Sequence, residues 1–78
     1  MKTGQYRHYS GNHYQVLGVV QHTETRQKMV LYRALYECPD LVDEYGEFPC
    51  FVRPFDMFHE DVEHGGRVVP RFEYIAPV

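Results

Sequence analysis

The chain has 78 residues and a net charge of −3, and 44% of its residues are hydrophobic, including seven Tyr and five Phe. A chain of this length builds one small domain with a limited core, so we expect a single domain over 1–78, ordered from about 4 to 76. It lacks an apolar run near the roughly 18 residues that span a bilayer, and its first residues do not resemble a signal peptide, which predicts a soluble cytoplasmic protein.

The charges are distributed unevenly along the chain. Residues 1–36 hold five basic residues and one acidic residue, whereas residues 37–64 hold nine acidic residues and one Arg. Two solvated faces of unlike charge explain this pattern. The alternative is a basic, aromatic face that binds an anionic ligand.

The first half of the chain predicts a three-stranded meander. Alternation over residues 5–9 predicts a first strand, and the Ser-Gly-Asn sequence at 10–12 predicts a turn. The runs 13–22 and 28–36 are rich in β-branched, aromatic and aliphatic residues and flank a polar segment, which predicts a long hairpin. A helix over the second run is rejected on length. Gly18, in the middle of the first run, predicts a bulge or bend.

The second half of the chain predicts shorter elements. Residues 37–49 form a long acidic loop with Pro near both ends and room for one helical turn around 41–45. A strand, a short helical turn, a tight turn and a last strand follow at 50–53, 55–62, 63–66 and 70–75.

These elements favour a mostly β fold. Five short strands, one long hairpin and a single short helical turn predict a small, strongly bent antiparallel barrel of the SH3-like kind. The alternative is an α+β fold in which a short helix at 55–62 packs on a sheet.

Catalysis and metal binding are not indicated. Nucleophilic catalysis needs a Ser, Cys or Thr beside an oriented base, and the sequence holds no such motif. Cys38 and Cys50 flank an acidic loop without CxxC spacing, so reduced thiols are expected. His8 and His13 face each other across the first turn in this interpretation, but two ligands do not close a metal site. We predict no enzyme activity, no catalytic residue, no metal and no cofactor.

Two arginines within strand patterns, Arg33 and Arg53, are the candidates for a site. The structural interpretation pairs Arg33 with Glu24 or Glu60, and Arg53 with Asp56 or a loop carbonyl. The functional interpretation places both around a shallow pocket where Arg holds an anion and Tyr stacks on the ligand. The candidate ligand-binding residues are Tyr6, His8, Tyr32, Arg33, Tyr36 and Arg53.

Several motifs together carry a family resemblance. They are residues 6–25, residues 29–36, Val52-Arg53-Pro54, Met57-Phe58 and Pro70-Arg71-Phe72. In combination they resemble the small bacterial family known as domain of unknown function 1653, over about residues 4–75. The chain departs from that pattern at Ser10, at residues 26–27 and at Phe51, where the family more often has Lys, an acidic residue and Trp. The resemblance implies a domain and not a mechanism.

Two classes of binding module follow from these features. The Tyr excess and the net acidity favour recognition of a protein segment in a Tyr/Arg groove. The basic, aromatic first half favours the alternative, a module for nucleic acid, a nucleotide or an anionic metabolite, although the chain has no strong basic stripe. We expect a monomer, or a weak dimer through a strand edge.

Overall fold

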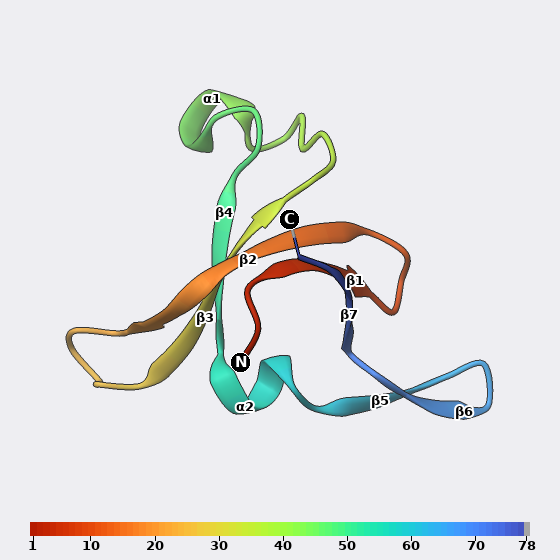
Figure 1. Cartoon of the computed structure of the whole chain (residues 1–78). Coiled ribbons are helices and arrows are strands. Elements are labelled where there is room, and N and C mark those ends of the chain that lie inside the picture. Colours follow the sequence, from red (N-terminus) through yellow and green to blue (C-terminus); the bar gives the residue numbers. More distant parts are fainter. Residues whose placement is uncertain (78) are drawn as a thin grey trace.

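The computed structural model describes residues 1–77 and is mostly β (Figure 1). This part of the chain folds into seven strands and two single-turn helices. The strands are β1 Gly4–His8, β2 His13–Gln21, β3 Lys28–Ala34, β4 Cys50–Pro54, β5 Asp61–His64, β6 Arg67–Pro70 and β7 Phe72–Ala76, and the helices are α1 Val42–Tyr45 and α2 Phe55–Phe58.

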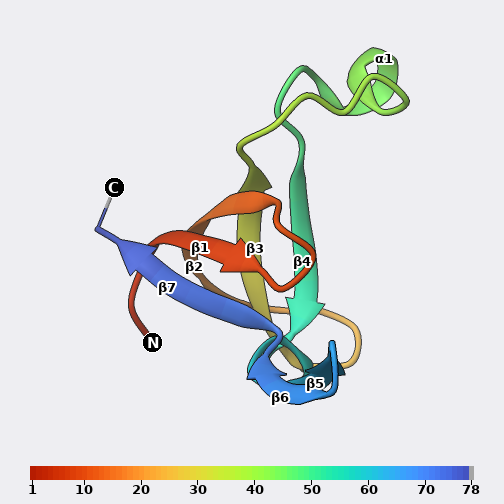
Figure 2. The same ribbon diagram turned by 90° about the vertical axis from the view of Figure 1, so that its right-hand side faces the viewer.

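Five of the strands form one antiparallel sheet in the order β4-β3-β2-β1-β7, while β5 and β6 form a separate hairpin. Figure 2 shows β7 and β4 at opposite edges of the bent sheet, with α1 beyond one end of β4. No backbone pairing joins β4 to β7 within residues 1–77. The predicted antiparallel, mostly β fold is therefore confirmed, whereas closure into a barrel is not.

The bend in β2 lies where the sequence predicts it. Val16 pairs with Tyr32 and Gly18 pairs with Leu31, so Leu17 is an extra residue in β2 and the register shifts by one. A bulge of this kind increases the local twist and allows a long hairpin to curl. The prediction of a bulge at Gly18 is confirmed.

One face of the sheet carries the core. Its buried cluster consists of Tyr6, Val16, Val30, Tyr32, Phe58 and Phe72. Phe58 comes from α2 and stacks on Phe72 of β7, with 4.0 Å between ring centroids and 5° between ring planes. This contact attaches the single helical turn after β4 to the last strand, so α2 covers the open end of the aromatic core.

The segment before the last strand differs from the prediction. The helical turn expected over 55–62 ends at Phe58, and Asp61–His64 instead pairs with Arg67–Pro70 as the β5–β6 hairpin. Gly65 and Gly66 both have positive φ in the connecting turn. The hairpin was missed because its apolar residues are few, and Val62 and Val69 are only half-buried. No helix within residues 1–77 is long and apolar enough to cross a membrane.

Candidate functional site

The inner face of the sheet, which also carries the core, gathers a partly open group of polar aromatic and basic side chains. Strand register brings them together, because His8 is opposite Phe72 in β7, Tyr32 is opposite Phe51 in β4, and Arg53 is the next inward residue of β4. We define the Tyr/Arg surface as His8, Tyr14, Tyr32, Tyr36 and Arg53.

Arg53 is held in place by uncharged partners. Its Nε donates a hydrogen bond to the Tyr32 hydroxyl at 3.2 Å, and its Cζ lies 5.5 Å from the centroid of the Phe72 ring. No ion pair involves Arg53 among residues 1–77, and its side chain is half-buried. A guanidinium that is oriented by a hydroxyl and a ring, with no carboxylate partner, retains donors for an anionic ligand.

Tyr14 lies at the centre of this surface. Its hydroxyl and that of Tyr36 share a hydrogen bond of 2.7 Å, and its ring makes edge contacts with Tyr32 and Phe72. Burial raises the pKa of the Tyr14 phenol well above its usual value, and the hydrogen bond to Tyr36 adds to the shift. The Tyr14 hydroxyl therefore stays protonated near neutral pH and serves as a hydrogen-bonding group.

His8 adds a titratable group to the same surface. Its ring lies 4.9 Å from Phe72, centroid to centroid, and its Nδ1 hydrogen-bonds the Ser10 Oγ at 2.7 Å. Burial lowers the pKa of His8, and the positive charges of Arg53 and Arg71 lower it further. The imidazole is consequently neutral at pH 7, and an anion bound beside it would favour its protonation.

Of the six candidate residues, His8, Tyr36 and Arg53 are half-buried on this surface. Tyr32 is buried in its floor, where its hydroxyl accepts the hydrogen bond from Arg53. Tyr6 is buried beneath it, and its hydroxyl donates to the Lys2 carbonyl at 2.7 Å, which makes it a core residue. Arg33 is exposed on the opposite face of β3, because neighbouring side chains of a strand point to opposite faces. The structure therefore separates Arg33 from the other five.

The expected ion pairs of the arginines are wrong. Among residues 1–77, Glu60 pairs with Arg71 at 3.2 Å rather than with Arg33. Arg53 hydrogen-bonds the Tyr32 hydroxyl rather than Asp56 or a loop carbonyl.

Tyr14 is the residue that sequence reasoning missed. The turn at 10–12 contained the signal, because a hairpin closed there pairs Tyr14 with Tyr6 and puts both rings on the inner face.

The expected pairing of His8 with His13 is also wrong. In the register of β1 and β2, His13 is opposite Arg7, and its Nδ1 is 2.6 Å from the Gln5 Nε2. The two histidines thus point to opposite faces of the sheet. Among residues 1–77, no three His, Cys, Asp or Glu side chains come close enough together to hold a metal ion.

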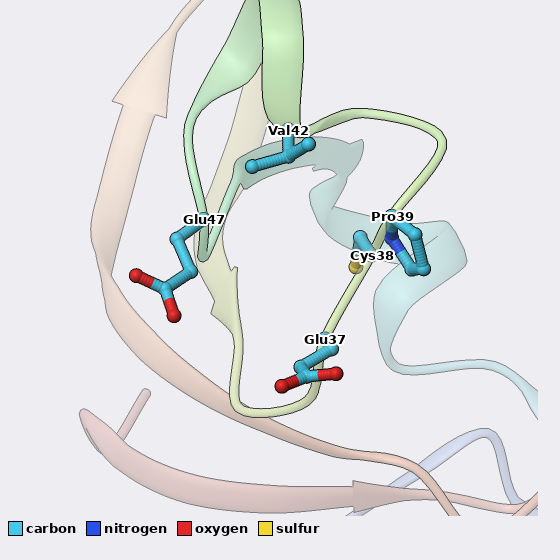
Figure 3. A pocket seen from close by; sticks show the side chains of 5 residues that line it. All are labelled: Glu37, Cys38, Pro39, Val42 and Glu47. Atoms are coloured by element: carbon cyan, nitrogen blue, oxygen red, sulfur yellow. The ribbon is translucent and has the colours of Figure 1, made fainter.

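A hollow lies in the acidic loop, away from the sheet face. It has a volume of about 280 Å³ and is lined by Glu37, Cys38, Pro39, Val42 and Glu47 (Figure 3). The Cys38 thiol donates to the Tyr36 carbonyl at 3.7 Å, and neither cysteine forms a disulfide within the described residues. Two carboxylates without a basic residue disfavour an anion here, so this hollow and the Tyr/Arg surface differ in the sign of their charge.

Comparison with known proteins identifies the family. The sequence model of a family described as a protein of unknown function, DUF1653, matches residues 4–74. The chain belongs to the DUF1653 family. A crystal structure of a DUF1653 protein from Bordetella bronchiseptica is similar to this DUF1653 chain, with a TM-score of 0.86 and 33% sequence identity, over 100% of this chain and 91% of that chain. No curated protein matches the chain. The resemblance noted in the sequence is confirmed.

Proposed function

We propose that this chain is a binding module, not an enzyme, that recognises a protein segment through the Tyr/Arg surface. We also propose that the fold is an SH3-like barrel left open on one side. The support is the strand order, in which β7 returns beside β1 after the short helix that follows the four-stranded meander. Small β-barrels of this kind commonly bind extended peptides on aromatic surfaces.

The observation that carries the proposal is the state of Arg53. A half-buried guanidinium ordinarily has a carboxylate partner, yet this one has a phenol and a ring. The hydroxyls of Tyr14 and Tyr36 beside it supply further hydrogen bonds, and the half-buried ring of Phe51 supplies apolar contact area. Together these groups suit a protein segment that carries one carboxylate among apolar residues.

A nucleotide, a nucleic acid or a small anionic metabolite is the second candidate ligand. Half-buried aromatic rings beside an Arg also suit a stacked base and a phosphate. Nucleic-acid binding draws on many Lys and Arg contacts, whereas this surface offers one Arg and a neutral His. The protein segment therefore has the stronger support.

The test is an NMR titration of the ¹⁵N-labelled chain. The probe is a pool of capped heptapeptides that carry one Asp or Glu among apolar and β-branched residues, with ATP and a short RNA as comparators. We expect the peptides to shift signals of Tyr14, Tyr32, Tyr36 and Arg53. Arg53→Ala abolishes these shifts, whereas the exposed Arg33→Ala, a matched loss of charge on the opposite face, leaves them unchanged.

The contrary outcomes are equally distinct. RNA or ATP binding that falls steeply with salt, without peptide binding, establishes the second candidate. Peptide shifts that survive Arg53→Ala remove the Tyr/Arg surface as the site.

A further inference from the structure

The free edge of β4 presents unused backbone hydrogen-bonding groups. The Ala34 amide donates to the Pro49 carbonyl at 3.0 Å, so Ala34 and Pro49 form a hydrogen-bonded cross-strand pair. In an antiparallel ladder, hydrogen-bonded and non-hydrogen-bonded pairs alternate. The next pair, Arg33 with Cys50, is therefore a non-hydrogen-bonded pair, and so is Leu31 with Val52. The N–H and C=O groups of Cys50 and Val52 consequently point away from β3.

Nothing in the described chain uses these groups. The only strand beside β4 is β3, and neither the Cys50 nor the Val52 amide has another hydrogen-bond acceptor within residues 1–77. Cys50 is exposed, and Val52 is 54% exposed. An unpaired edge of this kind can accept one more strand.

A hollow of about 270 Å³ adjoins the same edge. Leu41 and Tyr45 line it from the α1 segment, and Cys50 and Phe51 line it from the start of β4. Tyr45 is 60% exposed, so its ring is available for contact. Figure 1 shows α1 at this end of β4 and α2 at the other end, where Arg53 lies. The edge thus has an apolar hollow at one end and a cationic group at the other.

We propose that the recognised segment adds to the free edge of β4 as a sixth strand of the main sheet. This inference rests on the proposed function and names the form of its ligand. The occupant is an extended protein segment with an apolar residue in the hollow beside Tyr45 and an acidic residue beside Arg53. Because Phe51 and Arg53 are two residues apart on one face of β4, the two ligand residues are also two apart.

The charges at the two ends of β4 determine where the apolar and the acidic residue of the bound segment lie. The loop around α1 carries Glu37, Asp40, Asp43, Glu44 and Glu47 and no basic residue. These carboxylates repel an acidic residue from the hollow, whereas Arg53 attracts one at the far end of β4. The apolar residue therefore lies at the α1 end and the acidic residue at the α2 end.

The test uses the capped heptapeptides Thr-Thr-Leu-Thr-Glu-Thr-Thr and Thr-Thr-Glu-Thr-Leu-Thr-Thr, which place Leu in the hollow when they run parallel and antiparallel to β4, respectively. Their backbone N-methylated forms are tested beside them. A segment paired with β4 directs only every second amide toward it. At one set of alternating positions, we expect each single N-methyl group to weaken binding about fivefold, which is the equivalent of one lost backbone hydrogen bond. N-methylation at the intervening positions has no such effect. In the labelled protein, exchange of the Cys50 and Val52 amide protons slows when the peptide binds.

Two variants and their control complete the experiment. Val52→Pro removes one outward donor at an edge position that tolerates Pro, and we expect it to weaken binding about as much as one N-methyl group. Tyr45→Ala weakens the binding of peptides with Leu more than the binding of peptides that have Ala in place of that Leu. Phe48 is an exposed aromatic residue of the same loop, and Phe48→Ala does not have this effect.

Three results would overturn the inference. If binding requires Arg53 but no set of N-methyl groups matters, the edge is not used and the proposed function stands. If the peptides bind without dependence on Arg53, both proposals fail. If the free protein is a dimer that Val52→Pro converts to a monomer, a second copy of the chain occupies the edge.

Discussion

Removal of one hydroxyl tests whether Tyr14 and Tyr36 act as a unit. Each hydroxyl is the other's hydrogen-bond partner at 2.7 Å, and both side chains are half-buried. A net hydrogen bond of this kind contributes about 1 kcal/mol to the free energy of unfolding, so Tyr14→Phe lowers that free energy by about 1 kcal/mol. Tyr36→Phe removes the same bond and has the same effect. The double variant then loses about 1 kcal/mol and not twice that amount.

Urea unfolding followed by circular dichroism measures all three variants, and in a domain of this size such a loss lowers Tm by about 5 °C. Tyr45→Phe is the matched control, because Tyr45 is highly exposed and its hydroxyl has no hydrogen bond within residues 1–77, and it changes stability by less than about 0.5 kcal/mol. Additive losses in the double variant would show that the two hydroxyls do not interact. The hydrogen bond between Tyr14 and Tyr36 at the centre of the Tyr/Arg surface would then be refuted.

Three further predictions follow from the fold. Gly4 has φ of +130°, and an added Cβ would lie 2.5 Å from a backbone oxygen of β7, so Gly4→Ala destabilises the domain by more than about 1 kcal/mol in urea unfolding. Gly18→Ala meets no atom within 4 Å and is tolerated. Phe58→Ala costs about 3 kcal/mol or more, against about 0.5 for the exposed Phe48→Ala, and equal losses would refute the stacked core. The folded-state pKa of His8 lies below its ordinary 6.5, so the unfolded chain binds more protons as pH falls through that value; stability therefore drops toward pH 5, and a His8→Gln variant that kept the same slope would contradict this assignment.

The sequence predicts the meander well because its signals are local. Alternating apolar residues, the Gly-Asn turn and the mid-strand Gly18 each report on their own neighbourhood, and the structure has all three features. The β5–β6 hairpin was missed for a related reason. It buries little apolar surface, so Asp61–His64 carries almost no periodic pattern.

The site was predicted less completely because it depends on register. Parity along one strand separates Arg33 from Tyr32, but which parity faces the core depends on the packing of the whole sheet. Arg33 and Arg53 both lie within apolar strand sequences, yet only the side chain of Arg53 points inward, toward Tyr32 and Phe72. Tyr14 is identified as a site residue only by its pairing with Tyr6 in the register of β1 and β2.

The most direct test of the account is a selection of random peptides against the immobilised protein, repeated with Arg53→Ala and with Arg33→Ala. We predict that the wild-type chain and Arg33→Ala enrich the same sequences, with an apolar and an acidic residue two positions apart, and that Arg53→Ala loses the acidic preference. Identical enrichment by all three proteins, or enrichment that only Arg33→Ala abolishes, would contradict recognition of a protein segment at the Tyr/Arg surface.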